Sequence, residues 1–157
     1  GRFYSWPAAM DSAAVFSNDG AGCGEDTTCV KNLPVRGICP VGWHLPSGDE
    51  WKTLISVLGS DAGSKLKSAI GWKDNKLGES GGGTDDYGFT AFPAYRGDYN
   101  NGYRQYAVFH SSSGGGKSYV DGFILSYDKS SAYVSYYAIY NQWFYNSSKM
   151  PIRCLKN

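Results

Sequence analysis

The sequence lacks three features that would indicate common functions: a charge of one sign, a long apolar run and a group of histidines. It holds 15 lysines and arginines against 14 aspartates and glutamates, for a formal charge of +1, and two histidines. Without a basic run, binding to nucleic acid is not expected. No apolar run approaches the roughly 20 residues that cross a bilayer, so no membrane span is expected. No signal peptide is present, and we interpret the chain as a mature or excised piece of a longer protein.

What the sequence does contain is aromatic residues and glycine. Aromatic residues make up 16% of the chain and glycine accounts for 21 of its 157 residues. This combination is typical of a loop-rich domain with many exposed rings. The length predicts one domain over residues 1–157, which can bury roughly 70% of the surface of its unfolded chain.

Four cysteines in a chain of this size indicate an oxidising compartment, and hence a secreted or cell-surface protein. Cys23 and Cys29 enclose a short polar loop in which a local bridge is geometrically reasonable, and that bridge would leave Cys39 for Cys154. Four cysteines allow three pairings, however, and the sequence alone does not choose among them. The alternative is a zinc site, but the ligand spacings would be Cys-x5-Cys and Cys-x9-Cys with both histidines isolated. We expect neither a metal nor another cofactor.

The clearest structural signal is a helix over residues 47–58. Ser47 is a good N-cap, and Glu50 lies three residues later, where its carboxylate can reach back to the Ser47 amide in a capping box. One apolar stripe follows at positions i, i+3, i+4 and i+7, formed by Trp51, Leu54, Ile55 and Leu58. Gly59 can adopt the left-handed conformation that ends a helix. The two prolines upstream predict an extended lead-in, because each disfavours helix at the residue before it.

The rest of the N-terminal half predicts short elements separated by loops. Ser5 can cap a short helix around residues 8–10. Further along, we expect a short strand over 35–39, a weak helical turn from 63 that becomes extended over 66–72, a glycine-rich loop with little to pack over 73–83, and a strand over 89–95.

The C-terminal half predicts an antiparallel meander. The expected strands cover residues 106–110, 119–127, 132–138 and 152–155, with alternation of period two in the middle pair. Residues 128–131 are a plausible hairpin connection. The predicted fold class is therefore α+β, with short N-terminal helices, a twisted antiparallel sheet and long irregular loops.

Tyrosines concentrate in this half, where eleven of the 13 lie between Tyr95 and Tyr145. Two loops combine rings with amides or arginine, and their candidate residues for binding a ligand or partner are Tyr95, Arg96, Tyr99, Asn100, Tyr103, Gln142, Trp143 and Tyr145. Such a surface is typical of a sugar platform, where rings stack on sugar faces, or of a protein-binding surface. The alternative is that these rings only support long loops. We predict that they form a shared binding face.

Signals for catalysis or metal binding have simpler structural explanations. His44 is predicted to be a packed, hydrogen-bonded residue. His110 precedes three serines, but neighbouring residues on a strand point to opposite faces, and no carboxylate has a recognisable spacing from them. Asp85 and Asp86 could ligate calcium, although a Thr-Asp-Asp-Tyr-Gly turn also uses such side chains to cap a tight loop. We therefore expect no enzyme activity.

Four ordered motifs resemble one known family. They are Gly37-x-Cys-Pro-x-Gly-Trp-His-Leu-Pro-Ser-x-x-Glu-Trp51, Gly82-Gly-Thr-Asp-Asp-Tyr-Gly-Phe89, His110-Ser-Ser-Ser113 and Ile152-Arg-Cys-Leu-Lys156. Together they resemble the Fibrobacter succinogenes major paralogous domain family from one end of the chain to the other. The resemblance implies a secreted or surface protein of a gut or environmental bacterium, with a fold similar to the C-type lectin and formylglycine-generating group. It also implies the pairs Cys39–Cys154 and Cys23–Cys29, and no settled biochemical activity.

The chain departs from the family pattern at two places. Family members usually carry a strand pair and an aromatic turn before the residues that match Arg2 to Met10, and this chain starts after them. Either the missing piece is removed by processing or it lies outside the given sequence, or it comes from a companion chain. Each alternative leaves part of the sheet open for a partner, which could be that companion chain or a second copy in self-association. At Phe109-His110, relatives tend to have an aromatic residue such as tryptophan before the serines.

Two functional hypotheses follow. The first is a non-catalytic recognition or adhesion module at a bacterial surface, which binds carbohydrate or a surface protein through the Tyr/Trp-rich loop face. The second is a structural subunit of a surface fibre or pilus-like appendage, in which the aromatic face is the interface between subunits.

Overall fold

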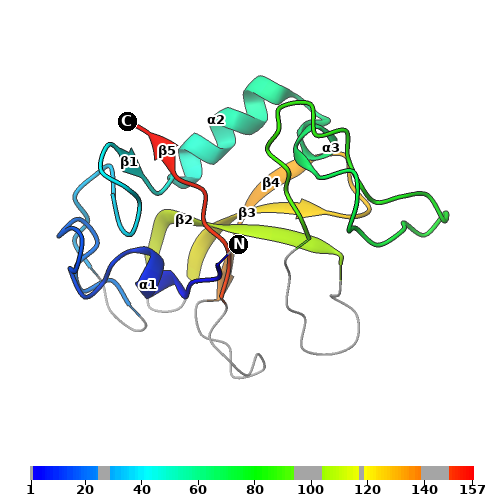
Figure 1. Ribbon diagram of the computed structural model, residues 1–157. Helices are drawn as coiled ribbons and strands as arrows, with labels where there is room; N and C mark the ends of the chain where they lie inside the picture. The colour runs from blue at the N-terminus through cyan, green and yellow to red at the C-terminus, as the bar shows by residue number, and fades with distance from the viewer. Residues whose placement is uncertain (1, 25–28, 94–103, 117–118, 139–148) are drawn as a thin grey trace. The chain divides into compact units, whose positions relative to one another are not determined.

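The computed structural model describes residues 2–24, 29–93, 104–116, 119–138 and 149–157, which form an α+β fold (Figure 1). Its helices are α1 (Trp6–Ala9), α2 (Gly48–Leu58) and α3 (Ala62–Leu66), and its strands are β1 (Trp43–His44), β2 (Tyr106–Gly116), β3 (Tyr119–Ser126), β4 (Ala132–Ala138) and β5 (Leu155–Lys156). β1 pairs with β5, and the second sheet has the order β2-β3-β4. Both sheets are antiparallel, so the predicted α+β class is confirmed. The predicted meander is confirmed for β2, β3 and β4, but the expectation that the last strand continues it is wrong, because β5 pairs with β1 in a separate sheet.

Strand boundaries differ from the prediction mainly at two places, apart from β3, which ends one residue early at Ser126. β2 continues to Gly116, well beyond the expected end at residue 110, and β5 begins at Leu155 instead of residue 152. The third expected strand, 132–138, has the predicted bounds, and the connection between β3 and β4 covers the predicted hairpin. β2 is longer than expected because its Ser-Gly-rich end carries no apolar alternation to reveal it.

Both expected disulfides are present. Cys23 bonds to Cys29 across six positions, and Cys39 bonds to Cys154 across 115 positions. The long bridge joins the lead-in of α2 to the residues just before β5. In the chain-entropy view, closing so long a loop contributes about 4 to 5 kcal/mol by restricting the unfolded state.

The described residues divide into two compact units. The first comprises residues 1–50, 109–122 and 135–157, and the second comprises 51–108 and 123–134. Among the described residues, no helix is long and apolar enough to cross a bilayer.

The first unit is built around α1. Its core consists of Trp6, Ala9, Met10, Cys23, Val35, Cys39, Leu45 and Val120. The Trp6 indole is buried, and its Nε1 donates a 2.8 Å hydrogen bond to the Ser111 carbonyl. A buried indole needs such a partner, because its N–H would otherwise lose its bond to water without replacement.

Two predictions for the first unit are wrong. Residues 35–39 form a turn and not a strand: Gly37 has a φ of 54°, and a Cβ there would lie 2.3 Å from the Ala9 carbonyl oxygen. The close approach of α1 therefore sets this segment. Ser5 precedes α1 in extended conformation but makes no side-chain cap hydrogen bond, and a proline occupies the first turn.

The second unit is built around an aromatic cluster beneath α2. Trp51 stacks on Phe123 with ring centroids 4.5 Å apart, and Phe89 meets both rings edge-on. The predicted stripe of α2 is confirmed in part: Trp51 and Leu58 are buried, while the two residues between them are half-buried. Gly59 ends the helix with a φ of 84°, as predicted.

The glycine run 81–83 packs tightly, which corrects the prediction of a loop with little to pack. Gly83 donates a 3.0 Å hydrogen bond to the Ser68 carbonyl, and Thr84 donates one of 2.8 Å to the Ser64 carbonyl. A Cβ on Gly83 would lie 2.1 Å from the Ser64 oxygen. Glycine is needed here because the two backbones touch.

The remaining elements of the second unit agree in part with the prediction. α3 corresponds to the weak helical turn, and the chain after Leu66 is extended, as expected. The strand expected over 89–95 is wrong for residues 89–93, where only Ala91 forms an isolated bridge to Lys67.

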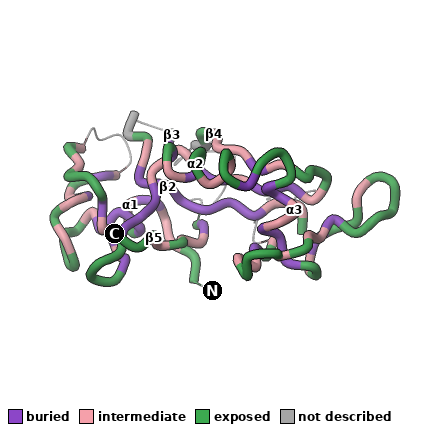
Figure 2. Tube along the Cα trace, turned by 90° about the horizontal axis from the view of Figure 1, so that it is seen from above, coloured by how far each residue is buried: buried purple, intermediate pink, exposed green. Residues whose placement is uncertain are grey.

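β2 carries a buried polar stretch in its centre. Much of β2 is buried (Figure 2). The buried residues are 107–112, of which His110, Ser111 and Ser112 are polar. The Nε2 of His110 lies 2.7 Å from the Tyr4 carbonyl oxygen, which can only accept, so this nitrogen carries the proton. Burial lowers the pKa of His110 to about 4, and the bond to Tyr4 only partly opposes this shift. The ring is therefore neutral in the folded chain near pH 7.

Replacing Trp51 by alanine should destabilise the second unit. The side chain is 4% exposed and stacks on Phe123, so truncation leaves a cavity that costs about 3 to 5 kcal/mol. The matched control is Val57→Ala, on the exposed side of the same helix at 78% exposure, for which a change within about 0.5 kcal/mol is expected. Urea unfolding measures both, and equal midpoints for the two variants would show that the aromatic cluster is not a core.

Acidification should destabilise the fold through His110. The pKa falls from 6.5 to about 4 on folding, so between these values the unfolded chain binds more protons than the folded one. The free energy of unfolding therefore decreases as the pH falls through this window, by on the order of 3 kcal/mol in total. Urea titrations at stepped pH values measure the slope. Glutamine does not titrate, so His110→Gln should lose most of the dependence of the unfolding free energy on pH in this window. An unchanged slope in this variant would show that other groups cause the pH dependence.

Candidate functional site

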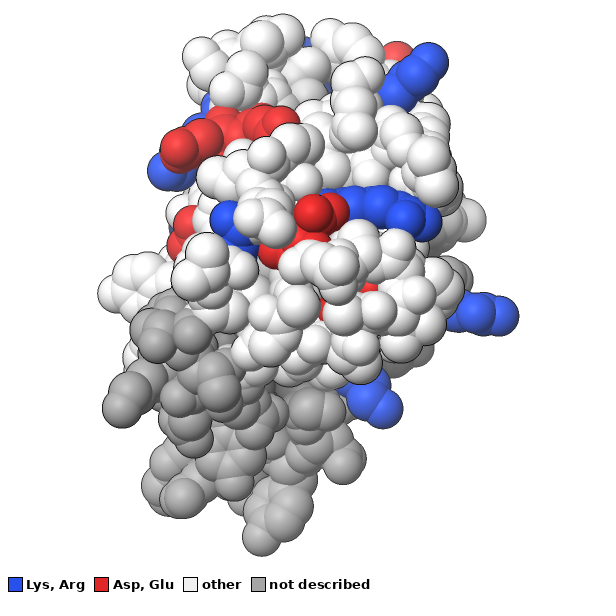
Figure 3. All heavy atoms as spheres, turned by 90° about the vertical axis from the view of Figure 1, so that its left-hand side faces the viewer, with Lys and Arg blue, Asp and Glu red and all other residues white. Residues whose placement is uncertain are grey.

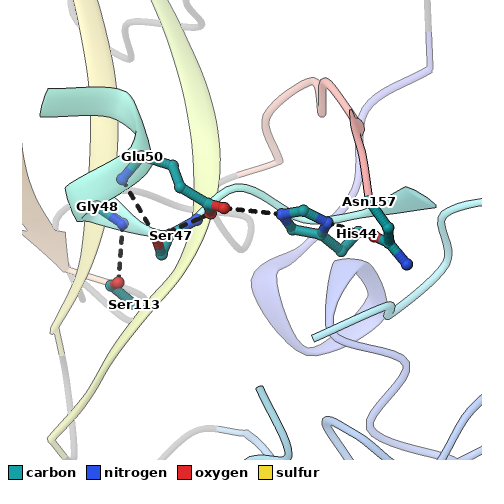
Figure 4. Close-up of polar contacts among 6 residues, drawn as sticks. All are labelled: His44, Ser47, Gly48, Glu50, Ser113 and Asn157. Carbon is teal, nitrogen blue, oxygen red and sulfur yellow. Dashed lines mark hydrogen bonds and ion pairs between the residues drawn. The ribbon is translucent and has the colours of Figure 1, made fainter. Parts of the chain in front are cut away.

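The start of α2 is held by a complete capping box (Figure 4). The backbone N–H of Ser47 donates to Glu50 Oε2 at 2.7 Å, and the Ser47 hydroxyl donates to the same oxygen at 2.9 Å. In return, the Glu50 N–H donates to Ser47 Oγ at 3.2 Å. The N–H of Gly48, which has no carbonyl partner within the helix because it lies in the first turn, donates to Ser113 Oγ at 2.8 Å. The capping box predicted from the sequence is thus confirmed.

The other oxygen of Glu50 lies against a buried histidine. His44 Nε2 is 3.0 Å from Glu50 Oε1, and His44 Nδ1 is 2.6 Å from Asn157 Oδ1 (Figure 4). The pairing of β1 with β5 places His44 opposite Leu155 and brings Asn157 within reach. The prediction that His44 is packed and hydrogen-bonded is confirmed. It connects the first turn of α2 with the end of the chain.

These bonds keep Glu50 ionised. Partial burial alone would raise the pKa of the carboxyl group, but the bonds from the Ser47 N–H, the Ser47 hydroxyl and His44 outweigh it and hold the pKa below its usual range. The site therefore carries a carboxylate at neutral pH.

A pocket of about 300 Å³ opens beside this network in the first unit. Its walls are Leu33, Pro34, His44, Leu45, Ser47, Glu50 and Ser112. Leu45 and Ser112 are buried at its base, while Leu33 and Pro34 are exposed. The pocket thus combines an apolar wall with one carboxylate and two hydroxyl groups.

The network does not have the order of a catalytic triad. A serine nucleophile needs a neighbouring base such as histidine. Here the carboxylate of Glu50 stands between Ser47 and His44, and its lowered pKa makes it a poor base. The arrangement suits binding and fixed geometry.

Two of the three serines after His110 make structural hydrogen bonds through their hydroxyl groups. Ser111 Oγ accepts from the Ser113 N–H at 3.0 Å, and Ser113 Oγ accepts from the first turn of α2. His110 itself faces Tyr4, as described above.

The eight residues predicted to bind a ligand lie outside the described part of the chain. They are Tyr95, Arg96, Tyr99, Asn100, Tyr103, Gln142, Trp143 and Tyr145. Their role as a shared face stays a prediction.

Asp85 takes the capping role considered for it in the sequence. Its Oδ1 accepts from the Thr90 N–H and its Oδ2 from the Thr90 hydroxyl, both at 2.6 Å. Asp86 lies in the same turn. The described residues contain no group of three or more histidine, cysteine, aspartate or glutamate side chains that could hold a metal ion.

Two exposed tyrosines were not singled out as binding residues from the sequence. Tyr119 on β3 and Tyr136 on β4 are 55% and 72% exposed, and their rings meet edge-to-face with centroids 5.7 Å apart. The available signal was alternation along β3, where buried Val120 places its neighbour on the opposite face.

Replacing Ser47 by alanine should destabilise the start of α2. The variant loses the bond to the Glu50 N–H and one donor to the carboxylate, which costs about 1 kcal/mol. Ser60→Ala, at an exposed position after the helix, is the control and should unfold like the parent chain. Chemical unfolding compares the three, and a Ser47→Ala midpoint equal to that of the parent would mean that the cap contributes nothing.

Comparison with known proteins identifies the family. No curated protein and no solved structure matched the chain. The family described as the Fibrobacter succinogenes major domain matches residues 1–156, which is nearly the whole sequence. The motif from Gly37 to Trp51 supplies one cysteine of the long disulfide, β1 and the capping box, so the residues behind the earlier resemblance are those that build the site. The chain belongs to the Fibrobacter succinogenes major domain family.

Proposed function

We propose that the chain is a non-catalytic recognition or adhesion module at a bacterial surface and that it binds carbohydrate through exposed aromatic side chains. Two disulfides support a secreted or cell-surface location, because such bonds persist in oxidising compartments. On the face shown in Figure 3, acidic and basic side chains are interspersed, which favours a neutral ligand over a strongly charged one.

The observation that carries this proposal is the exposed pair Tyr119 and Tyr136. The strands fix both rings, because β3 and β4 are hydrogen-bonded neighbours. Each ring offers apolar area for a sugar face and a hydroxyl group for hydrogen bonding. Large rings left in water beside one another are more informative than scattered exposed residues, since contiguous apolar surface usually marks an interaction site.

The proposal includes the two predicted loops and the finer fold type. Tyr136 lies in the strand that leads directly into residues 139–148, which contain Gln142, Trp143 and Tyr145. We also propose that the fold is C-type lectin-like. The pairing of β1 with β5 and the bridge between Cys39 and Cys154 support this, because both join early and late parts of the chain.

Removing either exposed tyrosine should weaken binding to polysaccharide. Tyr119→Ala and Tyr136→Ala are each expected to reduce affinity for a bound insoluble polysaccharide roughly thirtyfold, as for a ring at the centre of a binding face. The probes are cellulose, xylan, mannan and chitin in pull-down titrations. Tyr87→Ala, which removes a 63% exposed tyrosine from the second unit, is the matched control and should bind like the parent chain. Melting temperatures should stay within a few degrees, because the rings are exposed.

Other outcomes would support different functions. A parent chain that binds none of the probes but self-associates in a light-scattering concentration series, with loss of association in the two variants, would favour a fibre subunit with this pair in the interface. Release of soluble sugar from a probe would contradict the non-catalytic assignment. Equal binding by the two variants and Tyr87→Ala would remove the pair from the site.

A further inference from the structure

We propose that the pocket beside the capping box binds a single neutral sugar residue. This inference rests on the proposed function, since it assigns the ligand class of a second contact site for carbohydrate. It concerns residues different from the exposed tyrosine pair, so the two can be tested separately.

The carboxylate of Glu50 has room for one more donor. Its two oxygens accept bonds from the Ser47 N–H, the Ser47 hydroxyl and the His44 ring. A carboxylate offers about four acceptor positions. It is ionised and lines the pocket, so a ligand hydroxyl can donate to it. Charge-assisted bonds of this kind are about twice as strong as neutral ones.

Ser112 supplies a second polar group at the base. The residue is 2% exposed and lines the pocket. Its backbone is fixed, because its N–H donates to the Pro46 carbonyl at 2.9 Å and its carbonyl accepts from Lys31 Nζ at 2.9 Å. Its hydroxyl makes no hydrogen bond to another residue of the described chain. Because Ser112 lines the pocket, its hydroxyl is available to donate to or accept from a ligand there.

The remaining walls fix the size and polarity of the ligand. Leu33, Pro34 and Leu45 form an apolar side of the pocket. Among the described lining residues, Glu50 is the one carboxylate. A volume of about 300 Å³ lies at the lower end of ligand pockets and suits one small ring. A sugar ring has an apolar face for this side and adjacent hydroxyls that can donate to the carboxylate and bond to Ser112.

Charge argues against an anionic ligand, and the number of acceptor positions argues against an ammonium group. An anion would be repelled by the ionised Glu50. An ammonium group has three donors to satisfy, whereas the carboxylate has about one acceptor position left and already faces His44. A neutral ligand with several hydroxyls therefore fits best.

Several contacts restrain the polar side of the pocket. The capping box holds Ser47 and Glu50, and the bridge from Cys39 to Cys154 holds the lead-in. Lys31 also lies 5.4 Å from the centre of the buried Trp6 ring, which anchors it beneath Ser112. Preorganisation of this kind lowers the cost of binding.

Nuclear magnetic resonance titration of the ¹⁵N-labelled chain tests the proposal. The neutral probes are glucose, galactose, mannose and xylose, and the charged probes are glucosamine and glucuronate. We expect at least one neutral sugar to shift the amide signals of Ser47, Glu50 and Ser112 in a saturable manner, and its glucosamine or glucuronate counterpart to bind more weakly. Ser112→Ala should weaken this binding roughly five- to tenfold, the loss of about one hydrogen bond.

The control for Ser112→Ala is Ser60→Ala, which lies outside the pocket and should titrate like the parent chain. A melting curve confirms that Ser112→Ala is folded. Titrations that shift none of these amides, equal affinity in Ser112→Ala, or tighter binding of a charged probe would each overturn the proposal. Polysaccharide binding that depends on Tyr136 while these amides stay silent would overturn the pocket alone and leave the proposed function standing. Saturable shifts at the pocket, together with polysaccharide binding that the tyrosine variants leave unchanged, would support the pocket and contradict the role proposed for the tyrosine pair.

Discussion

The carboxylate of Glu50 is the interaction on which the first unit depends. One of its oxygens completes the cap of α2, and the other meets His44, which in turn contacts Asn157. Without this group, the first turn of the helix, β1 and the end of the chain would have no common polar partner. The disulfide from Cys39 to Cys154 joins the same two regions covalently. Polar and covalent ties therefore act on one junction, and the pocket lies beside it.

This junction explains what the family motif does. Gly37 allows the backbone of α1 to approach closely, Cys39 forms the bridge and Leu45 enters the core. Most residues of the motif thus have a structural role. Its polar residues also line a pocket, so the same side chains that determine the fold can present a ligand with fixed groups. The residues that determine the fold also line the pocket, so the motif by itself did not indicate a function.

Local rules predicted the parts of the fold that depend on local interactions. The capping box, the end of α2 at Gly59 and the strand 132–138 follow from neighbouring residues, and all are present. The wrong predictions concern segments whose conformation is determined by contact with backbone that is distant in the sequence. The turn at 35–39 is set by the approach of α1, and the run 81–83 by contact with residues 64–73. Neither approach leaves a periodic signal in the sequence.

The candidate sites were predictable only in part, for the same reason. His44 and Glu50 are close in sequence, and their contact could be inferred from the helix start. Ser112 and Leu33 reach the pocket from distant segments, and no spacing rule connects them. Tyr119 and Tyr136 face water because of the pleat of β3 and β4. Composition alone does not distinguish these exposed rings from the rings that are buried in the core.

The long disulfide also determines how the chain would respond to mechanical force. Tension applied at the two ends of the sequence would pass from residue 39 to residue 154 through the covalent bond. Residues 40–153, which include all of α2, α3 and the sheet β2-β3-β4, lie within the closed loop and would not be stretched. Only the segment before Cys39 and the few residues after Cys154 could extend, and the bridge between Cys23 and Cys29 shortens the first of these. A module tethered by its ends would therefore keep both the pocket wall at Glu50 and the tyrosine pair out of the path of the load.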